Sequence, residues 1–274
     1  IKASDGRVVL SENVVTRTPV IPDITNAELA RAFGADLILL NGLDAFDPKV
    51  VNVDEDKQVI NELRRLVCRP IGVNLEPVDK TATMSEEKLN IVEGRQASSK
   101  TVKALEKLGI NFICMTGNPG TGVTNDKIVN AISETRKHFT GLIIAGKMHS
   151  AGVDEPVITE TYVDQFIDAG ADIILVPSIG TVPGFDEEQL KNIVKAVHRR
   201  EGLVMSAIGT SQESSDPSTI RDFAIRNKIC GVDIQHIGDA GYCGLAPVNN
   251  IFELSKAIRG ERHTVSMIAR SIQR

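Results

Sequence analysis

Short apolar runs alternate along the chain with longer segments whose apolar residues recur at helical spacing. A short aliphatic run is typical of a buried strand, and apolar residues at positions i, i+3, i+4 and i+7 predict an amphipathic helix. Eight such runs occur, at residues 20–24, 37–41, 71–76, 112–116, 142–147, 173–177, 203–207 and 232–235. Strands that alternate with helices predict βαβ units and a parallel sheet.

A repeated turn sequence supports this alternation. Ile-Gly-Thr, Ile-Gly-Thr and Ile-Gly-Asp begin at Ile179, Ile208 and Ile237, each 29 residues after the last. Eight strand–helix units are the number that closes a barrel, and 274 residues is close to the usual length of about 250. The sequence therefore predicts an α/β protein, a single (β/α)₈ TIM barrel over residues 1–274. An open doubly wound sheet is the alternative.

The two ends of the chain fall outside the eight predicted units. Residues 7–15 look like a strand but are not followed by a helix, so we expect residues 1–18 to form an N-terminal hairpin or plug beneath the barrel. Residues 249–274 contain no further strand-like run. We expect this segment to pack as one or two terminal helices.

Composition narrows the class of protein. Apolar residues make up 42% and charged residues 24%, and no apolar run approaches 18 residues, which indicates a globular protein without a membrane span. The N-terminus lacks the hydrophobic region of a signal peptide. The net charge of −5 is spread without blocks, which argues against nucleic acid as a partner. Four cysteines without C-x-x-C spacing suggest reduced thiols in a cytoplasmic protein, and homo-oligomer formation stays open.

Enzymes with this fold place their working groups at the carboxyl ends of the strands. Alternation in 71–76 turns Glu76 inward, alternation in 142–149 turns Lys147 and His149 inward, and alternation in 232–235 does the same for Asp233. Burial of a lysine at a strand end is costly unless something there uses it, although Glu76 or Asp233 could be its ion-pair partner. The predicted catalytic residues are Lys147, His149, Glu76, Asp23 and Asp233.

Further polar residues lie at or near the predicted strand ends. They are Asn41, Asn74, Thr116, Asn118, Ser178, Ser206, Gln235 and His236. We expect them to line the mouth, with the alternative that some are structural groups satisfied by one another and by water. His236 is ambiguous, because strict alternation places it on the helix side.

The loops after the seventh and eighth strands predict a phosphate site. Barrel enzymes often bind phosphate there on backbone N–H groups, beside a short helix. The residues expected to bind it are Gly209, Thr210, Ser211, Gly238, Asp239 and Gly241. Asp239 does not fit this role directly, since a carboxylate repels a dianion; it could face away, cap a helix or bind a metal.

Cofactor signals are weak. The glycine-rich segment 117–122 has its glycines in the wrong order for a dinucleotide fingerprint, and no zinc pattern occurs. We predict no organic cofactor. Carboxylates at Asp23, Asp44, Glu76 and Asp233 leave Mg²⁺ binding open.

Three segments carry a resemblance to a known group: residues 26–42, 146–149 and 233–241. Together they resemble an uncharacterised family of bacterial TIM-barrel proteins sometimes labelled phosphoenolpyruvate-mutase-like, and the resemblance spans nearly the whole chain. It implies the barrel fold but no established reaction. The chain lacks the cysteine-bearing signature of isocitrate lyases.

Three functional hypotheses follow. The first is a lyase or isomerase of carbohydrate metabolism that acts on a small phosphorylated carbonyl compound, by proton abstraction or C–C cleavage. Glu76 or His149 would be the general base, and Lys147 would neutralise an enolate or form a Schiff base. The second is a Mg²⁺-dependent lyase or mutase of the phosphoenolpyruvate type. The third is a regulatory barrel that binds a phosphorylated metabolite without turnover.

Overall fold

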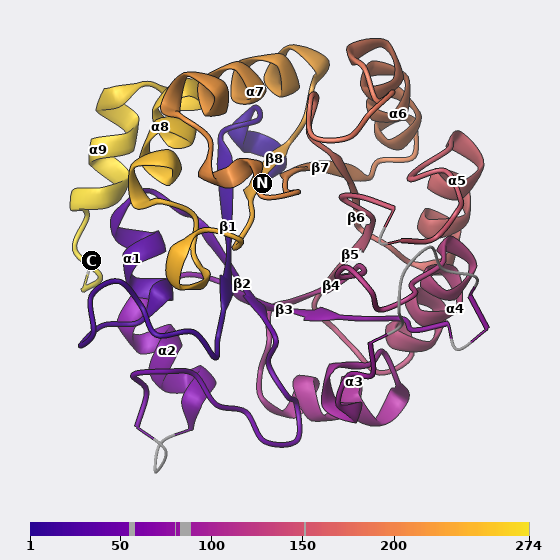
Figure 1. Cartoon of the computed structure of the whole chain (residues 1–274), viewed down its shortest axis with the longest axis horizontal. Coiled ribbons are helices and arrows are strands. Elements are labelled where there is room, and N and C mark those ends of the chain that lie inside the picture. The colour runs from indigo at the N-terminus through magenta and orange to yellow at the C-terminus, as the bar shows by residue number, and fades with distance from the viewer. Residues whose placement is uncertain (55–57, 80, 83–88, 151, 274) are drawn as a thin grey trace.

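The computed structural model describes residues 1–54, 58–79, 81–82, 89–150 and 152–273. Eight parallel strands form a closed barrel in chain order, and the helices surround it as a ring (Figure 1). The strands are β1 (Val8–Val14), β2 (Leu37–Asn41), β3 (Ile71–Leu75), β4 (Phe112–Met115), β5 (Leu142–Gly146), β6 (Ile173–Pro177), β7 (Leu203–Ile208) and β8 (Ile234–Ile237). The predicted (β/α)₈ TIM barrel is confirmed.

One helix follows each strand, and a further helix ends the chain. They are α1 (Asn26–Ala32), α2 (Val59–Val67), α3 (Ser99–Lys107), α4 (Asn125–Arg136), α5 (Glu160–Ala169), α6 (Glu187–Arg199), α7 (Pro217–Cys230), α8 (Val248–Arg259) and α9 (Glu261–Ala269). Four 3₁₀ turns are η1 (Lys2–Ser4), η2 (Glu93–Arg95), η3 (Gln212–Ser214) and η4 (Tyr242–Gly244). The helical C-terminus is confirmed, and none of the described helices is long and apolar enough to cross a membrane.

The prediction for the first strand is wrong. Residues 20–24 form an exposed loop, with Val20 62% exposed, whereas β1 comes from the segment expected to be a plug. β1 pairs with β2 on one side and β8 on the other, so it closes the barrel. Pro22 explains the error, because a proline inside a run cannot donate to the ladder of a central strand. Thr25 then caps α1 with its side chain and leaves no room for a strand before that helix.

Alternation along the strands separates two apolar layers. Residues facing the barrel interior, which we call the lumen, include Leu10, Leu39, Phe112, Cys114, Ile144, Leu175, Met205 and Ile234. Residues facing the helices include Val9, Ile38, Ile71, Val73, Ile113, Ile143, Ala145, Ile174, Val204 and Ile237. Because both faces of each strand are buried, the strands read as continuous apolar runs, as expected for a parallel barrel. The polar inward positions toward the carboxyl ends then define the mouth.

Gly72 on β3 leaves room for an aromatic ring inside the lumen. A Cβ atom at this position would lie 2.1 Å from the ring of Phe112, which pairs with Gly72 across β3 and β4. We therefore expect Gly72→Ala to destabilise the fold by about 1–3 kcal/mol through overpacking. Urea unfolding followed by circular dichroism measures this change. If Gly72→Ala were as stable as the wild type, Phe112 would have to be free to move.

Candidate active site

Five inward-facing polar residues meet at the carboxyl ends of the strands. They are Glu12 on β1, Asn41 on β2, Asn74 on β3, Thr116 after β4 and His236 on β8. Each continues the inward series of its own strand, above a lumen residue two positions earlier, as His236 follows Ile234 and Glu12 follows Leu10. All five are buried. The mouth is thus a polar layer resting on an apolar lumen.

Glu12 and His236 form a buried hydrogen-bonded pair across the point where the barrel closes. The Glu12 Oε2 atom lies 2.8 Å from His236 Nε2, and the two side chains are 4% and 0% exposed. Asn74 donates its side-chain amide to Glu12 Oε1. Both carboxylate oxygens of Glu12 are therefore engaged, and the imidazole is fixed through Nε2, the arrangement by which a carboxylate sets the tautomer of a histidine.

Several polar atoms in this layer have no hydrogen-bond partner among the described residues. They are His236 Nδ1, Asn74 Oδ1 and Thr116 Oγ1, all of them buried. A buried polar atom without a partner is costly, and native structures usually satisfy it with water or ligand. The layer therefore has free hydrogen-bonding capacity on β3, after β4 and on β8.

Asp239 lies in the loop after β8 and adds a carboxyl group to this layer. It accepts a 2.8 Å hydrogen bond from Asn41 Nδ2. Burial and the nearby charge of Glu12 raise the pKa of Asp239 to about 7, while Asn41 and His236 oppose the rise. Asp239 can therefore both hold and release a proton near neutral pH, as a general acid–base group must.

A second set of contacts joins Asp239 to the far side of the mouth. Asn41 also donates to Asn118 Oδ1 at 3.2 Å, and the Asn118 backbone N–H donates to Glu76 Oε2 at 3.1 Å. Glu76 is 1% exposed and pairs with Arg95 of η2 at 2.8 Å. The structure therefore brings together Glu76, Asn41, Asn118 and Asp239, which the sequence placed at the mouth, with Arg95, which it did not.

Glu213 of η3 occupies part of the region where we expected phosphate. Its Oε1 atom accepts the backbone N–H of Ala240 at 2.8 Å, and its Oε2 atom has no partner among the described residues. Burial raises the pKa of Glu213. The backbone N–H groups of Thr210 and Ser211, in contrast, donate to no group in the described parts of the chain. Of the other predicted phosphate donors, Gly238 donates its backbone N–H to the Ile208 carbonyl at 2.9 Å, and the backbone N–H groups of Gly209, Asp239 and Gly241 also donate to no described group.

The predicted direction of Lys147 is wrong. Ile144 faces the lumen and Ala145 the helices, so Lys147 follows the helix-facing series rather than the inward one. Its ammonium forms a close ion pair with Glu155, which also accepts the backbone N–H of Asn125 at the start of α4. Burial lowers the pKa of Lys147. This pair fastens the loop after β5 to α4, and His149 lies partly exposed in the same loop.

We expect Lys147→Met to affect stability rather than chemistry. Loss of the ammonium leaves Glu155, 18% exposed, with an unbalanced charge, which costs about 1–3 kcal/mol because the group is only partly buried. Thermal melts should show this loss, and Lys147→Met/Glu155→Gln should recover much of it. Borohydride should trap no carbonyl compound on the wild type. If the Lys147→Met protein folded but had no turnover, Lys147 would have to take part in the reaction.

The inward direction predicted for β8 is also wrong. Gln235 donates to the Ala224 carbonyl of α7 at 2.8 Å, so it faces the helices, and His236 takes the inward position. Asp233 precedes β8 and contacts His198 and the backbone of Val204, at the amino end of the strands, opposite the mouth.

The remaining departures concern Ser178, Ser206 and Asp23. Ser178 accepts a hydrogen bond from Asn227 of α7 at 2.7 Å, and therefore lies on the helix side. Ser206 alternates with the inward residues Met205 and Ala207, so it faces the helices as well. Asp23 lies exposed in the loop between β1 and α1. None of the three belongs to the polar layer.

Within the described parts of the chain, the carboxylates considered for Mg²⁺ do not form a site for a divalent metal. Among the described residues, no three His, Cys, Asp or Glu side chains are placed to hold one. Glu12 and Glu76 already use both oxygens on protein donors, and Asp23 and Asp233 lie away from the mouth. Asp44 accepts the backbone N–H of Phe46. We therefore derive no step through Mg²⁺.

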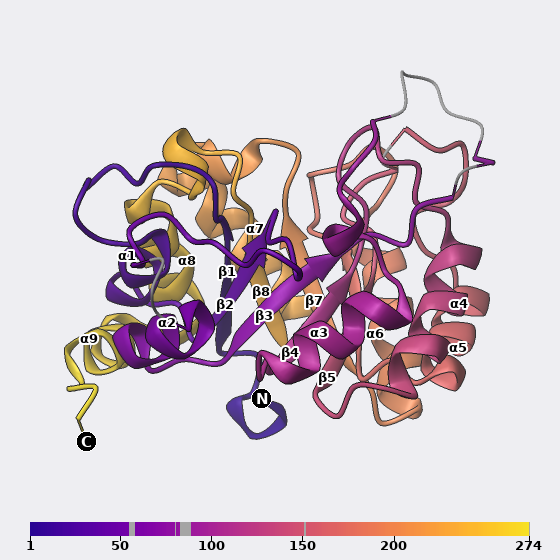
Figure 2. The ribbon, with the colours of Figure 1, turned by 90° about the horizontal axis from the view of Figure 1, so that it is seen from below.

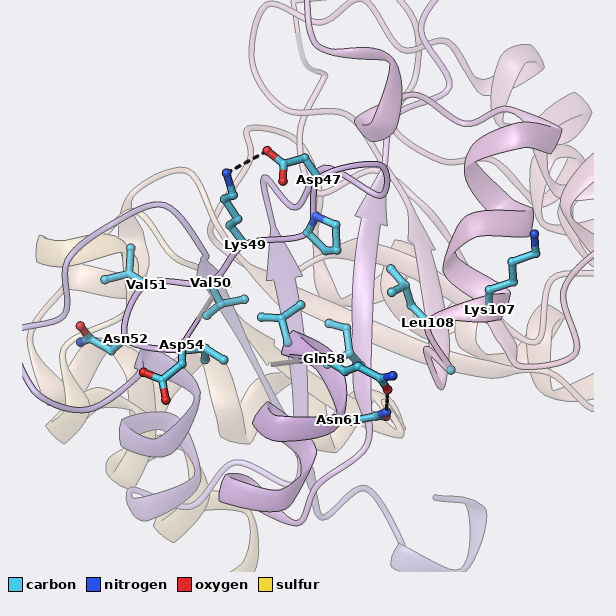
Figure 3. A pocket seen from close by; sticks show the side chains of 15 residues that line it. Asp47, Lys49, Val50, Val51, Asn52, Asp54, Gln58, Asn61, Lys107 and Leu108 are labelled. Carbon is cyan, nitrogen blue, oxygen red and sulfur yellow. Dashed lines mark hydrogen bonds and ion pairs between the residues drawn. The ribbon is translucent and has the colours of Figure 1, made fainter. Parts of the chain in front are cut away.

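A cavity of about 840 Å³ lies apart from the polar layer at the mouth (Figure 3). Residues 47–54, 58–61 and 107–109 line it, from the loop after β2, from α2 and from the end of α3. Within its lining, Lys49 pairs with Asp47 at 3.1 Å, and Asn61 donates its side-chain amide to Gln58 Oε1 at 2.5 Å. It shares no residue with the polar layer.

The fold and the polar layer define a TIM barrel with an acid–base cluster at its mouth. Residues 1–274 match the model of a family described as a domain of unknown function, DUF7916, and the chain belongs to this family. No curated protein matches the chain.

Solved structures with 12–15% sequence identity share the fold. A protein from Burkholderia cenocepacia J2315 with a provisional lyase/mutase name superposes with a TM-score of 0.53 at 15% identity, over 96% of this chain and 92% of that one. Thiamine phosphate pyrophosphorylase from Pyrococcus furiosus superposes with a TM-score of 0.53 at 14% identity, over 95% of this chain and 98% of that one. 2,3-Dimethylmalate lyase, a PEP mutase/isocitrate lyase superfamily member, superposes with a TM-score of 0.51 at 12% identity, over 86% of this chain and 77% of that one.

Proposed function

We propose that the protein is a lyase or isomerase that moves a proton at the carbon next to the carbonyl of a small phosphorylated compound. One observation carries the proposal: a histidine fixed by a buried glutamate leaves Nδ1 unpaired beside a carboxyl whose pKa is about 7. Matched acid and base groups in a water-poor site are what carbon-acid chemistry needs.

The two groups take complementary roles. With its Nε2–H held by Glu12, neutral His236 presents a lone pair at Nδ1 and acts as the general base. The negative charge of Glu12 stabilises the imidazolium that forms. Asp239, protonated in part near pH 7, delivers or accepts the second proton. The Thr116 hydroxyl, which has no partner among the described residues, is free to donate to the developing enolate oxygen.

Support for a phosphate group comes from the loop after β7. The backbone N–H groups of Thr210 and Ser211 are open, and the two loops lie side by side because Gly238 donates to the Ile208 carbonyl at 2.9 Å. A phosphate on these amides would place the rest of a small substrate toward Asp239. The names of the similar structures, two with lyase and one with thiamine phosphate, agree with this chemistry without extending it to this chain.

The test combines binding with proton exchange. A thermal-shift screen compares phosphorylated carbonyl compounds, such as dihydroxyacetone phosphate, with the same compounds lacking phosphate. Each compound that raises the melting temperature is then incubated in D₂O and followed by ¹H NMR. We expect exchange or cleavage of a phosphorylated compound, lost in His236→Asn and unchanged by EDTA.

Three outcomes would overturn parts of the proposal. A ligand that stabilises the protein yet is recovered unchanged and without deuterium would make the barrel a binding protein. Equal responses to phosphorylated and unphosphorylated compounds would remove the phosphate site. Turnover that survives in His236→Asn would remove the assigned base.

A further inference from the structure

A groove on the side of α9 is lined by basic residues. It has a volume of about 420 Å³, and its lining residues are Arg259, Arg262, His263, Ser266, Met267 and Arg270. Arg262, His263, Ser266 and Met267 recur at three- and four-residue intervals and form one face of α9, whereas Arg259 ends α8 and Arg270 follows the last turn of α9. In Figure 2, α9 lies on the side of the two chain termini, whereas the strand arrowheads point toward the opposite side. The groove is thus remote from the mouth.

Arg259 forms the fixed inner wall of the groove. Its side chain is 1% exposed and pairs with Asp36 at 2.6 Å. It also donates to the Arg7 carbonyl at 3.2 Å and to Ser255 Oγ at 2.9 Å. Asp36 additionally accepts the backbone N–H of Val9 at 2.9 Å. One carboxylate therefore balances Arg259 and has no oxygen directed to a second arginine of the groove.

The remaining arginines carry positive charge without a carboxylate partner. The side chains of Arg262 and Arg270 contact no acid among the residues that the structure describes. Arg31 and Arg69 donate to the backbone carbonyls of Arg270 and Met267, at 2.9 and 3.4 Å, and bring two more positive charges to this region. Since the whole chain has a net charge of −5, this concentration of arginines is local.

The pKa of His263 is consistent with this concentration of positive charge. Its pKa is lowered, first by burial and then by the charges of Arg259, Arg7 and Arg270, against which Asp36 acts in the opposite direction. A histidine inside a cationic groove resists taking up a further proton. The positive charges in the groove therefore repel one another, and a bound anion would reduce this repulsion.

We propose that this groove is a binding site for a small anion with two or more negative charges, of the phosphate class. Arg262 and Arg270 would provide the mobile guanidinium groups, which match phosphate oxygens in pairs. Ser266 lies one turn after Arg262 on α9, lines the same groove and offers a hydroxyl donor. The site lies on a different element from the mouth and does not depend on the proposed reaction.

Calorimetric titration with pyrophosphate, at constant ionic strength, tests the proposal. We expect saturable binding to the wild type and a loss of about tenfold in affinity for each arginine removed in Arg262→Ala and Arg270→Ala. Arg199→Ala is the matched control: Arg199 is 70% exposed on α6 and lies 3.9 Å from its acid partner, so its removal changes the net charge equally. The control should bind as the wild type does.

Four results would overturn the proposal. They are the absence of saturable binding, an equal loss in Arg199→Ala, full wild-type binding in the Arg262→Ala/Arg270→Ala double variant, and tighter binding of a single-stranded oligonucleotide than of pyrophosphate through the same two arginines. The third result would assign the pyrophosphate to the mouth loops. The fourth would make the groove a nucleic-acid face. All variants should keep the wild-type circular dichroism spectrum, because both arginines are exposed.

Discussion

Replacement of Asp239 by Asn should lower turnover of the substrate found by the exchange assay by about 10²–10⁴-fold. The amide keeps the size of the side chain and can accept the hydrogen bond from Asn41, but it cannot carry a proton between substrate and solvent. The wild type should also show a change in kcat with a midpoint near the pKa of Asp239, about 7, that disappears in the variant. Steady-state kinetics between pH 5 and 9 measures both effects.

The same substitution should stabilise the fold at high pH. The folded-state pKa of Asp239, about 7, lies above its ordinary value of 3.8, so the folded state binds more protons than the unfolded state between these values. Stability contributed by the protonated form is present below pH 4 and lost as the pH rises toward 7. Asp239→Asn removes this loss. We therefore expect the free energy of unfolding to rise by about 1 kcal/mol at pH 8, which raises Tm by about 2–4 °C.

A surface aspartate provides the control for both measurements. Asp5, 85% exposed and distant from the mouth, can be replaced by Asn with the same change in charge. Asp5→Asn should change neither kcat nor the pH dependence of Tm. Should Asp239→Asn retain full turnover, Asp239 would have no part in proton transfer; should its stability fall at pH 8, its ionised form would be the favoured one in the folded protein.

Glu12→Ala should be the most destabilising of the substitutions considered. It removes the partner of His236, which is 0% exposed, and leaves the Asn74 amide without its acceptor. Breaking a buried pair from one side costs about 3–5 kcal/mol, which lowers Tm by roughly 10 °C for a domain of this size. Differential scanning calorimetry at pH 7 measures the loss.

Glu12→Gln separates the structural role from the chemical one. The glutamine oxygen can still accept the hydrogen bond from His236, and its NH₂ group can donate to Asn74 Oδ1 once the Asn74 amide turns over, so we expect a folded protein that has lost the negative charge behind His236. Its turnover should fall because the imidazolium formed in the reaction is no longer stabilised, and its pH profile should shift to lower pH because the charge of Glu12 helps to raise the pKa of Asp239. A Glu12→Gln protein with wild-type turnover would limit Glu12 to holding the barrel together.

The fold could be predicted because its signal is distributed over many residues. Seven of the eight predicted strand runs coincide with observed strands, and each is an aliphatic run followed by an amphipathic helix. The first strand was missed because Val8–Val14 has no helix immediately after it. Eleven residues of loop separate it from Asn26, and the exposed Val20 and Ile21 in that loop imitate a strand.

The site was predicted less well, and the reason lies in the strands themselves. In β3, the polar Asn74 alternates with the apolar Val73 and Leu75, so the pattern itself indicates that Asn74 faces inward. In β5 both Ile143 and Ile144 are apolar, because one faces the helices and the other the lumen, and alternation cannot tell which is which. The direction of Lys147 therefore depended on the three-dimensional packing.

Three residues of the site were missed for different reasons. Glu12 had a usable signal, since it is the charged inward residue of a strand-like run, and it was set aside with that run. Glu213 and Arg95 lie in short 3₁₀ turns within loops. No periodicity in the sequence directs a side chain from such a loop toward the mouth.

The pair at the centre of the mouth comes from the two ends of the barrel. Glu12 lies on the first strand and His236 on the last, 224 positions apart in the chain. A growing or partly folded chain can complete most of its strand–helix units and still lack this pair, because only the β1–β8 ladder brings the two residues together. The proposed proton transfer is thus tied to closure of the ring, and under this proposal an open or truncated barrel would be inactive.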